Sequence, residues 1–358
     1  MEDMGTRQAQ TLRETDRKCP QCGGTLSFAP GSAGLACPYC GHTEVVTGEV
    51  EIALEQDFAA AESTQSFDWG ANKKTLSCKA CGAESIFDEL QVSNSCPYCG
   101  SNLVTEAAGA NAMAPGGVCP FEVTGKRAAE LFLVWIKRRF FCPRKVKKNV
   151  SPEAFNGVYL PYWTFDCQTH SRFTAEYGIT RTVHHGKTTT THTTWHRTSG
   201  EHASFIDDQA VLASTRHDPQ TLQKIEPFRT GESRVYRPEY VAGFVSERYS
   251  IGLTDGWEKG KALIAARLQQ EISAQVKRRH HADQVRNVRM NTIHSEVKYK
   301  CLLLPLWLSA FTYRDKPYRI LVNGQTGKVG GKTPVSALRV ALVVAAGIAV
   351  IWLISRFM

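Results

Sequence analysis

The sequence predicts an α+β protein with a cysteine-rich N-terminal region, an antiparallel β-rich domain containing two amphipathic helices, and one apolar C-terminal helix. Three observations support this prediction. Paired cysteines recur within residues 17–104, runs rich in Thr, Tyr, Phe and Val follow beyond residue 159, and residues 335–355 are almost entirely apolar. At 358 residues the chain is long enough for two or three domains without disulfide support.

The N-terminal cysteines form an internal repeat. Eight of the 12 cysteines fall in four Cys-x-x-Cys pairs, a spacing typical of metal sites in a reducing compartment rather than of disulfides. The two copies have the same spacing between their pairs, and the second pair of each copy reads Cys-Pro-Tyr-Cys-Gly. Glycine follows every pair, which lets the backbone turn its amides toward the sulfurs. We therefore expect a duplicated module at 17–46 and 76–104.

Four soft ligands in a tetrahedron suit zinc, and two residues between cysteines let a tight turn direct both sulfurs at one ion. The sequence thus predicts two rubredoxin-like zinc ribbons with four cysteine ligands each, and each ribbon would hold one structural Zn²⁺ ion. The expected ligands are Cys19, Cys22, Cys37 and Cys40 in the first ribbon, and Cys78, Cys81, Cys96 and Cys99 in the second. Such closed sites stabilise folding and do not catalyse. Redox-active dithiols are the weaker interpretation, because they seldom occur as matched tetrads, and His42 is a weak alternative ligand.

The segments around the ribbons differ in composition. Acidic, moderately apolar residues at 47–75 predict a short helix or spacer, and small residues at 105–118 predict a linker. Apolar residues at helical spacing predict an amphipathic helix over 124–141, which Pro143 ends. A second helix is expected over 255–281. Its expected apolar face contains Leu263, Ile264, Leu268, Ile272 and Val276.

Two β-rich runs surround the second helix, at 159–212 and 284–329. The turn residues His185-Gly186-Lys187 and Asn323-Gly324 predict hairpins. The motif Leu-Pro-Tyr-Trp at 160–163 is repeated as Leu-Pro-Leu-Trp at 304–307, which indicates equivalent strands of one core. These elements together predict one cytoplasmic α+β domain over 119–333.

Residues 335–355 predict a transmembrane helix. Their length gives about 30 Å of helix, the thickness of a bilayer's hydrocarbon core. A buried or oligomerising helix is the alternative, but a core helix of this length normally has a polar face. The unbroken apolar stretch from residue 340 is preceded by Lys316, Arg319, Lys328, Lys332 and Arg339, and only Arg356 follows it, so the positive-inside rule places the N-terminal bulk in the cytoplasm. Residues 1–16 contain no signal-peptide pattern.

The formal net charge of +9 is unevenly distributed. Residues 1–100 carry 7 Lys and Arg against 14 Asp and Glu, whereas the remainder has a net charge of +16. The acidic ribbon region therefore disfavours contact with nucleic-acid phosphates. Residues 126–148 contain nine basic residues and one acid. This segment could be a solvated basic helix, or it could contact either nucleic-acid phosphates or anionic lipid. Between the two contacts we favour lipid, because the apolar helix would hold this segment near the membrane.

Other reactive side chains form no recognisable motif. The isolated cysteines, expected to be buried, are Cys119, Cys142, Cys167 and Cys301. Exposed strand surface accounts better than a metal site for the histidines of the predicted hairpin, His184, His185, His192, His196 and His202. The chain contains no His-Glu-x-x-His, no Gly-x-Ser-x-Gly and no phosphate-binding loop. We therefore predict that it is not an enzyme.

From Cys19 onward the chain resembles a bacterial family of membrane proteins with zinc ribbons of the transcription factor IIB type. The motifs that carry the resemblance are the paired ribbons, Gly157-Val-Tyr-Leu-Pro-Tyr-Trp-Thr-Phe165, Trp195 with Gly200, Phe205-Ile-Asp-Asp208, Tyr240-Val-Ala-Gly-Phe244, Leu303-Leu-Pro-Leu-Trp307 and Val322-Asn-Gly-Gln-Thr-Gly-Lys328. Members are often labelled primosomal protein N-prime, replication factor Y or superfamily II helicase, but this chain lacks helicase motor motifs.

The resemblance implies a scaffold that holds cytoplasmic partners at the bacterial inner membrane, in envelope-stress response. Phage-shock protein A-like and virion-core-like proteins are the partners it implies, together with the lipid bilayer. The alternative function is a nucleic-acid-binding ribbon protein linked to replication or transcription. Salt-dependent binding to DNA would distinguish the two.

Overall fold

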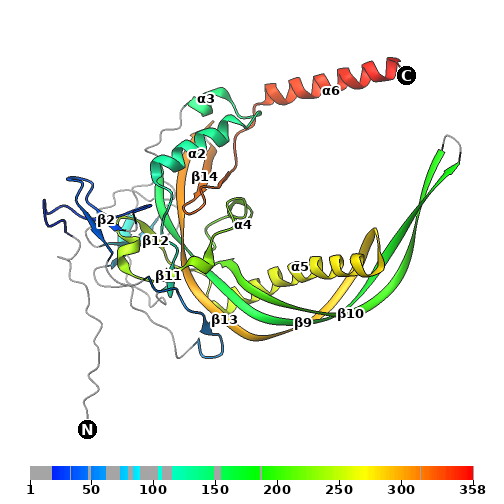
Figure 1. Cartoon of the computed structure of the whole chain (residues 1–358). Helices are drawn as coiled ribbons and strands as arrows, with labels where there is room; N and C mark the ends of the chain where they lie inside the picture. The colour runs from blue at the N-terminus through cyan, green and yellow to red at the C-terminus, as the bar shows by residue number, and fades with distance from the viewer. Residues whose placement is uncertain are drawn as a thin grey trace, which may run out of the picture.

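The structure, a computed structural model, describes residues 18–32, 34–46, 50–61, 73–79, 84–88, 104–106, 115–148, 155–185, 188–314 and 316–357. Within these ranges the chain forms a small three-stranded sheet and a large, mainly antiparallel sheet, with helices packed on the large one (Figure 1). The predicted α+β class is confirmed.

The small sheet belongs to the first cysteine-rich module. Its strands β1 (Ser27–Ala29), β2 (Gly34–Ala36) and β3 (Thr43–Val45) pair antiparallel in that order. The strands of the second module are β5 (Lys73–Cys78), β6 (Glu84–Asp88) and β7 (Val104–Glu106). This module joins the large sheet, because β6 pairs with β12 (Val245–Glu247).

The same backbone pairing occurs in each of the two modules. In the first, Lys18 forms an antiparallel bridge with Thr25 around the first cysteine pair. In the second, Ser77 pairs antiparallel with Glu84. The offset in sequence between these two pairings equals the offset between the corresponding cysteines of the two copies. The sequence repeat is therefore also a structural repeat at this position.

Three long strands form the centre of the large sheet in the order β10-β9-β13. They are β9 (Asn156–His185), β10 (Thr188–Leu212) and β13 (Gln284–Tyr313). The register shifts at three bulges, and each bulge contains a non-glycine residue with positive φ: Asp208 at 47°, Asn287 at 54° and Glu296 at 53°. Bulges bend and twist a sheet. They explain why these strands form an arch in Figure 1.

The two halves of the arch have different burial patterns. Residues 158–167 of β9 and 299–308 of β13 are buried on both faces, which explains their near-continuous apolar sequence. Farther along, burial alternates with each residue, as in Phe173 and Ala175 against exposed Thr174. The repeated Leu-Pro motifs lie in the fully buried half, where Leu160 pairs with Leu304. The expectation of one shared core is confirmed.

Helix α5 (Leu253–His280) lies along the concave side of the arch (Figure 1). Its buried stripe, spaced by four residues, contains Ile264, Leu268, Ile272 and Val276, all at most 1% exposed. Leu263 is 39% exposed, so its placement on this face was wrong. The reason is the rotation of about 100° between consecutive residues, which turns Leu263 away from a stripe only one residue wide.

Both segments expected to connect domains contribute to the large sheet. In the expected spacer, β4 (Gln56–Asp57) pairs with β13, and Phe58 packs against the aromatic side chains of Phe165 and Trp257. In the expected linker, β8 (Gly117–Val118) pairs with β13 and is buried. Burial of small residues beneath neighbouring side chains gives them an ordered position that composition alone does not predict.

The first predicted helix is confirmed as α2 (Gly125–Lys137), which Thr124 caps by accepting from the N–H of Arg127. It ends before the predicted residue 141, in a turn that leads to α3 (Arg144–Lys148). The other short elements are α4 (Pro219–Leu222), η3 (Thr230–Glu232), β11 (Arg234–Val235), η4 (Pro238–Val241), β14 (Lys316–Asn323) and β15 (Val329–Gly331). The buried Asn323 side chain organises the predicted turn between β14 and β15 by accepting from the N–H groups of Gln325 and Thr326.

The last element is α6 (Ala337–Phe357), which extends away from the rest of the chain (Figure 1). It is long and apolar enough to cross a membrane, with a mean hydropathy of 2.5 over Ala337–Arg356. None of that stretch is buried within the chain. The helix therefore forms no part of the core of this fold.

Candidate metal centre

The four cysteines of the first module converge on one point. The Sγ atoms of Cys19 and Cys40 are 3.5 Å apart, as are those of Cys22 and Cys37, and all four lie within 4.8 Å of one another. A tetrahedral ion with metal–sulfur bonds of about 2.3 Å requires sulfurs about 3.8 Å apart. The cluster fits a single four-coordinate ion. Zinc and iron both suit four soft thiolates in this geometry.

The backbone around each cysteine pair has the same hydrogen bonds. The N–H of Cys19 donates to the carbonyl of Gly24 at 2.6 Å, and the N–H of Gly23 donates back to Cys19 at 2.8 Å. The second pair repeats this, since Cys37 bonds to His42 at 2.8 Å and to Gly41 at 3.0 Å. Gly23 and Gly41 have φ values of 72° and 76°, a left-handed conformation that glycine adopts without strain. These turns direct the four Sγ atoms toward one point.

The sulfurs differ in their affinity for protons. The backbone N–H of Cys40 has the largest influence on Cys37 and, with the N–H of Tyr39, lowers the pKa of that thiol to about 6. The N–H of His42 favours the thiolate of Cys40, but the neighbouring Cys19 thiol and burial together raise the pKa of Cys40 to about 12. Charge on one sulfur opposes ionisation of the next. A complete tetrathiolate therefore requires a cation between the sulfurs.

The candidate centre is closed on one side and exposed on the other. Cys19 and Cys37 are buried, whereas Cys22 and Cys40 are exposed. The Nε2 atom of His42 lies 3.2 Å from Glu44 Oε1, an interaction that occupies the imidazole outside the cysteine cluster. The ligand set that the geometry brings together is therefore the four cysteines alone.

The second predicted tetrad falls largely outside the described residues. Cys78 ends β5 and is 2% exposed, in a core cluster with Leu160 and Leu302. Cys81, Cys96 and Cys99 lie outside the described ranges. The structure thus brings together one metal-binding group among the residues it describes, and the second ion remains a prediction.

The chain is 26% identical to "Uncharacterized protein YdjG" of Bacillus subtilis over 332 residues, which cover 90% of this chain and 91% of the relative. No family model and no solved structure matches the chain. An alignment of this length cannot be confined to the cysteine-rich segment. The similarity therefore includes most of the β-rich region as well.

The isolated cysteines are buried, as expected. Cys119, Cys142, Cys167 and Cys301 are all at most 5% exposed. Burial raises the pKa of Cys119 and Cys301 to about 12. His196 stacks on Tyr177, with ring centroids 5.2 Å apart, while His202 bonds to Glu271 and Gln275 of α5. The contacts of His202 attach α5 to the sheet, so this side chain lies at a packing interface and not on exposed strand surface. No described histidine belongs to a metal cluster, and the side chains of His184 and His185 lie outside what the structure describes.

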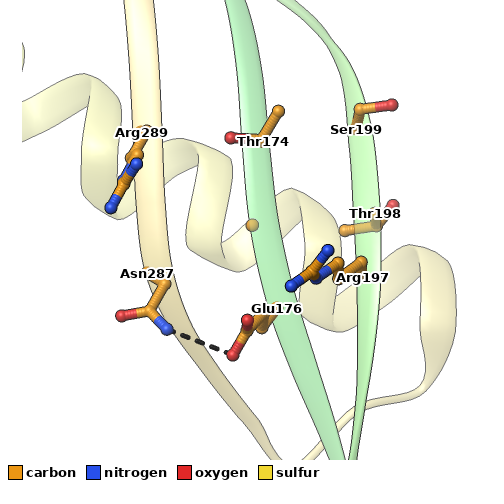
Figure 2. A pocket seen from close by; sticks show the side chains of 8 residues that line it. Thr174, Glu176, Arg197, Thr198, Ser199, Asn287 and Arg289 are labelled. Atoms are coloured by element: carbon orange, nitrogen blue, oxygen red, sulfur yellow. Dashed lines mark hydrogen bonds between the residues drawn. The ribbon is translucent and has the colours of Figure 1, made fainter.

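A shallow hollow of about 630 Å³ lies on the long sheet, lined by side chains from β9, β10 and β13 (Figure 2). Ala175 packs against α5, so alternation directs its neighbours Thr174 and Glu176 to the opposite face. Asn287 donates to Glu176 Oε2 at 3.1 Å, and the hydrogen bond from Arg286 is the main cause that lowers the pKa of Glu176. This carboxylate is therefore held in an ion pair with Arg286, whose Nε atom lies 2.9 Å from Glu176 Oε2.

Two buried charge clusters were missed by sequence reasoning. In one, Lys300 Nζ lies 2.9 Å from Asp208 Oδ1 and 3.0 Å from Glu55 Oε1. Burial favours the neutral amine, but these carboxylates raise the pKa of Lys300, so it remains charged. The position of Lys300 in a run of apolar residues was the available signal.

The second missed cluster surrounds Glu247, which is fully buried. Its carboxylate accepts from Ser214 at 2.5 Å and lies 2.8 Å from His217 Nε2 and 3.3 Å from Arg216. Burial alone would raise the pKa of Glu247, but His217, Ser214 and Arg216 together lower it. The Ser214 hydroxyl and the His217 imidazole both bond to this one carboxylate.

Proposed function

We propose that this chain is a non-enzymatic scaffold that α6 tethers to the bacterial inner membrane and that presents zinc ribbons to cytoplasmic protein partners. The observation that carries the proposal is α6: a mean hydropathy of 2.5 over 20 residues, with no burial in the chain. An exposed apolar surface of this size would aggregate in water. Insertion into a bilayer buries this apolar surface, and a helix can span the bilayer because its backbone groups form hydrogen bonds within the helix.

Zinc is the ion we propose for the four-cysteine centre, and the second tetrad is proposed to hold another. Ions in these sites would supply folding free energy to modules that have few apolar residues of their own. The exposed side chain of Tyr39, 79% accessible, lies beside the exposed ligand Cys40. Aromatic side chains on a rigid support are typical of protein-binding surfaces. This supports an adaptor surface at the ribbon.

The resemblance to proteins found beside phage-shock protein A suggests partners of that kind, and a role in envelope-stress response. The alternative is nucleic-acid binding, which the positive charge outside residues 1–100 favours. The two differ in salt dependence. A complex with DNA weakens steeply with rising salt concentration, in proportion to the phosphates contacted.

The tether is tested by following a partner rather than the chain. Proteins that co-purify with the full chain from solubilised membranes are identified, and the cellular location of each is compared between cells producing the full chain and cells producing residues 1–333. A scaffold should keep its partner in the membrane fraction only when α6 is present. A partner whose distribution does not change, or capture of nucleic acid alone, would refute the scaffold function.

A further inference from the structure

The turn between α2 and α3 exposes two aromatic rings among basic side chains. Phe140 is 62% exposed and Phe141 is 41% exposed, with ring centroids 5.4 Å apart. The surrounding residues 137–147 include six basic residues and no acidic residue: Lys137, Arg138, Arg139, Arg144, Lys145 and Lys147. Large exposed aromatic side chains in a group mark interaction surfaces. We call residues 137–147 the aromatic–basic turn.

The aromatic–basic turn is anchored from beneath. Cys142 is fully buried and Val146 is 4% exposed, and both belong to the core cluster that contains Phe132 and Ile136 of α2. Lys147 also donates to the carbonyl of Lys137 at 3.0 Å. Because the buried side chains hold the backbone from one side, the two phenylalanine rings remain on the outside.

The N-terminal end of α6 forms hydrogen bonds with this turn. The N–H of Ser336 donates to the carbonyl of Phe141 at 2.8 Å, and the guanidinium of Arg339 donates to the carbonyl of Cys142 at 3.1 Å and to that of Phe140. The same guanidinium lies 5.7 Å from the Phe140 ring centroid. With a rise of about 1.5 Å per residue, Arg339 is within about 5 Å of the start of α6. The two rings therefore lie at the level where α6 begins.

Several charged side chains of the turn are exposed. The exposed side chains of Arg138, Arg144 and Lys145 form no ion pair with any residue in the described part of the chain. By contrast, Arg139 stacks on Trp135 at 4.5 Å. Three exposed cations beside two exposed rings match the chemistry of a membrane interface, where aromatic side chains enter the headgroup layer and cations meet anionic lipids.

We propose that the aromatic–basic turn is a second membrane contact, which rests on the proposed insertion of α6. Phe140 and Phe141 insert at the headgroup boundary of the leaflet that α6 enters, while Arg138, Arg144 and Lys145 bind anionic phospholipids. Each basic residue near an anionic leaflet increases partitioning about fivefold. A contact at α6 and another at the turn fix the orientation of the domain. The ribbons are then held in a defined direction from the membrane instead of moving freely on a single tether.

The experiment places a photo-crosslinker, benzoylphenylalanine, at one position of the full chain in lipid nanodiscs. The test position is Phe140. The control for insertion of α6 is Trp352, which is 56% exposed, and the control for random lipid contact is Phe205 on β10, which is 52% exposed. Discs contain phosphatidylcholine alone or with phosphatidylglycerol. Lipid adducts are counted by mass spectrometry.

We expect Phe140 to form at least fivefold more lipid adducts than Phe205, with a higher yield in discs containing phosphatidylglycerol. The triple variant R138Q/R144Q/K145Q should lower the yield in these discs to that in neutral discs, while adducts at Trp352 persist. Adducts at Trp352 with none above the Phe205 level at Phe140 would overturn this inference and leave the tether intact. Absence of adducts at Trp352 would refute both. Adducts from Phe140 to protein instead of lipid would assign the turn to a protein partner.

Discussion

The ring of Phe28 packs edge-on against that of Tyr240, with centroids 5.8 Å apart and an angle of 71° between the planes. Nearby, the N–H of Phe28 donates to the carbonyl of Ala242 at 3.0 Å. This contact joins the first ribbon to η4, and through it to the core that contains Tyr159 and Trp307. The cysteine-rich module is thus part of the large domain's core, rather than an independent module on a flexible chain.

Phe28→Ala should weaken the ribbon, because removing a buried phenylalanine costs about 3 kcal/mol. The side chain of Phe28 is 3% exposed, so its truncation removes packing contacts that are almost entirely buried. We expect metal to leave the full chain up to about a hundredfold faster when a chromogenic chelator is added. Phe205→Ala, at a 52% exposed position, is the control and should leave the rate unchanged. Equal release rates for both variants would contradict the docking of the ribbon.

Metal content tests the two tetrads separately. The purified full chain should contain two zinc ions, and Cys37→Ser should lose one while retaining the other, since the tetrads are separate in sequence. Cys301→Ser removes a buried thiol outside the cluster and should retain both ions. Elemental analysis gives the content. Iron in place of zinc, or less than one zinc with the thiols intact and reduced, would contradict the zinc assignment.

Removal of α6 should release the chain from the membrane. A chain ending at Thr333 lacks the exposed apolar helix and should remain soluble and metal-loaded after ultracentrifugation. In cells that produce the full chain, protease added to spheroplasts should spare the ribbons, because the positive-inside rule keeps them in the cytoplasm. Digestion of the ribbons under these conditions would reverse the topology and remove the basis for cytoplasmic partners.

Glu247→Gln should destabilise the domain by about 3 kcal/mol at pH 7, because it removes the anionic charge that faces the buried His217 and the half-buried Arg216. The pKa of Glu247 is lowered below 4.5 in the folded chain. Its contribution is therefore fully present above that pH and is lost as the pH falls through the folded-state pKa. Urea unfolding of residues 1–333 should show the difference between the two proteins narrowing below pH 4.5.

Acid also removes metal from thiolates, so the measured quantity is the difference between the variant and the parent at each pH. Glu296→Gln is the matched control, since Glu296 lies at an exposed bulge of β13 and should show no such difference. A constant difference from pH 7 to pH 4 would show that the carboxylate charge does not stabilise this cluster.

Several elements could be predicted because their signal is contained in a few neighbouring residues. The spacing of Cys19, Cys22, Cys37 and Cys40 indicated a tetrad, which the structure brings within 4.8 Å. Periodicity predicted the boundaries of α2 and α5 to within about four residues. The length and apolar composition of residues 335–355 predicted a helix able to cross a membrane. These features depend on helix pitch, turn geometry and residue type, which act over short stretches of chain.

Only the tertiary structure decided which distant residues meet. Leu160 pairs with Leu304, Lys300 bonds to Glu55, and Arg339 reaches the carbonyl of Cys142, although the members of each pair lie far apart in the sequence. The first two contacts depend on strand register, and the bulges at Asp208, Asn287 and Glu296 reset that register along the long sheet. A shift of one residue reverses the face of every side chain beyond it. Local spacing therefore determined the elements and the first tetrad, whereas register and burial determined how the ribbon, the charge clusters and the foot of α6 are attached.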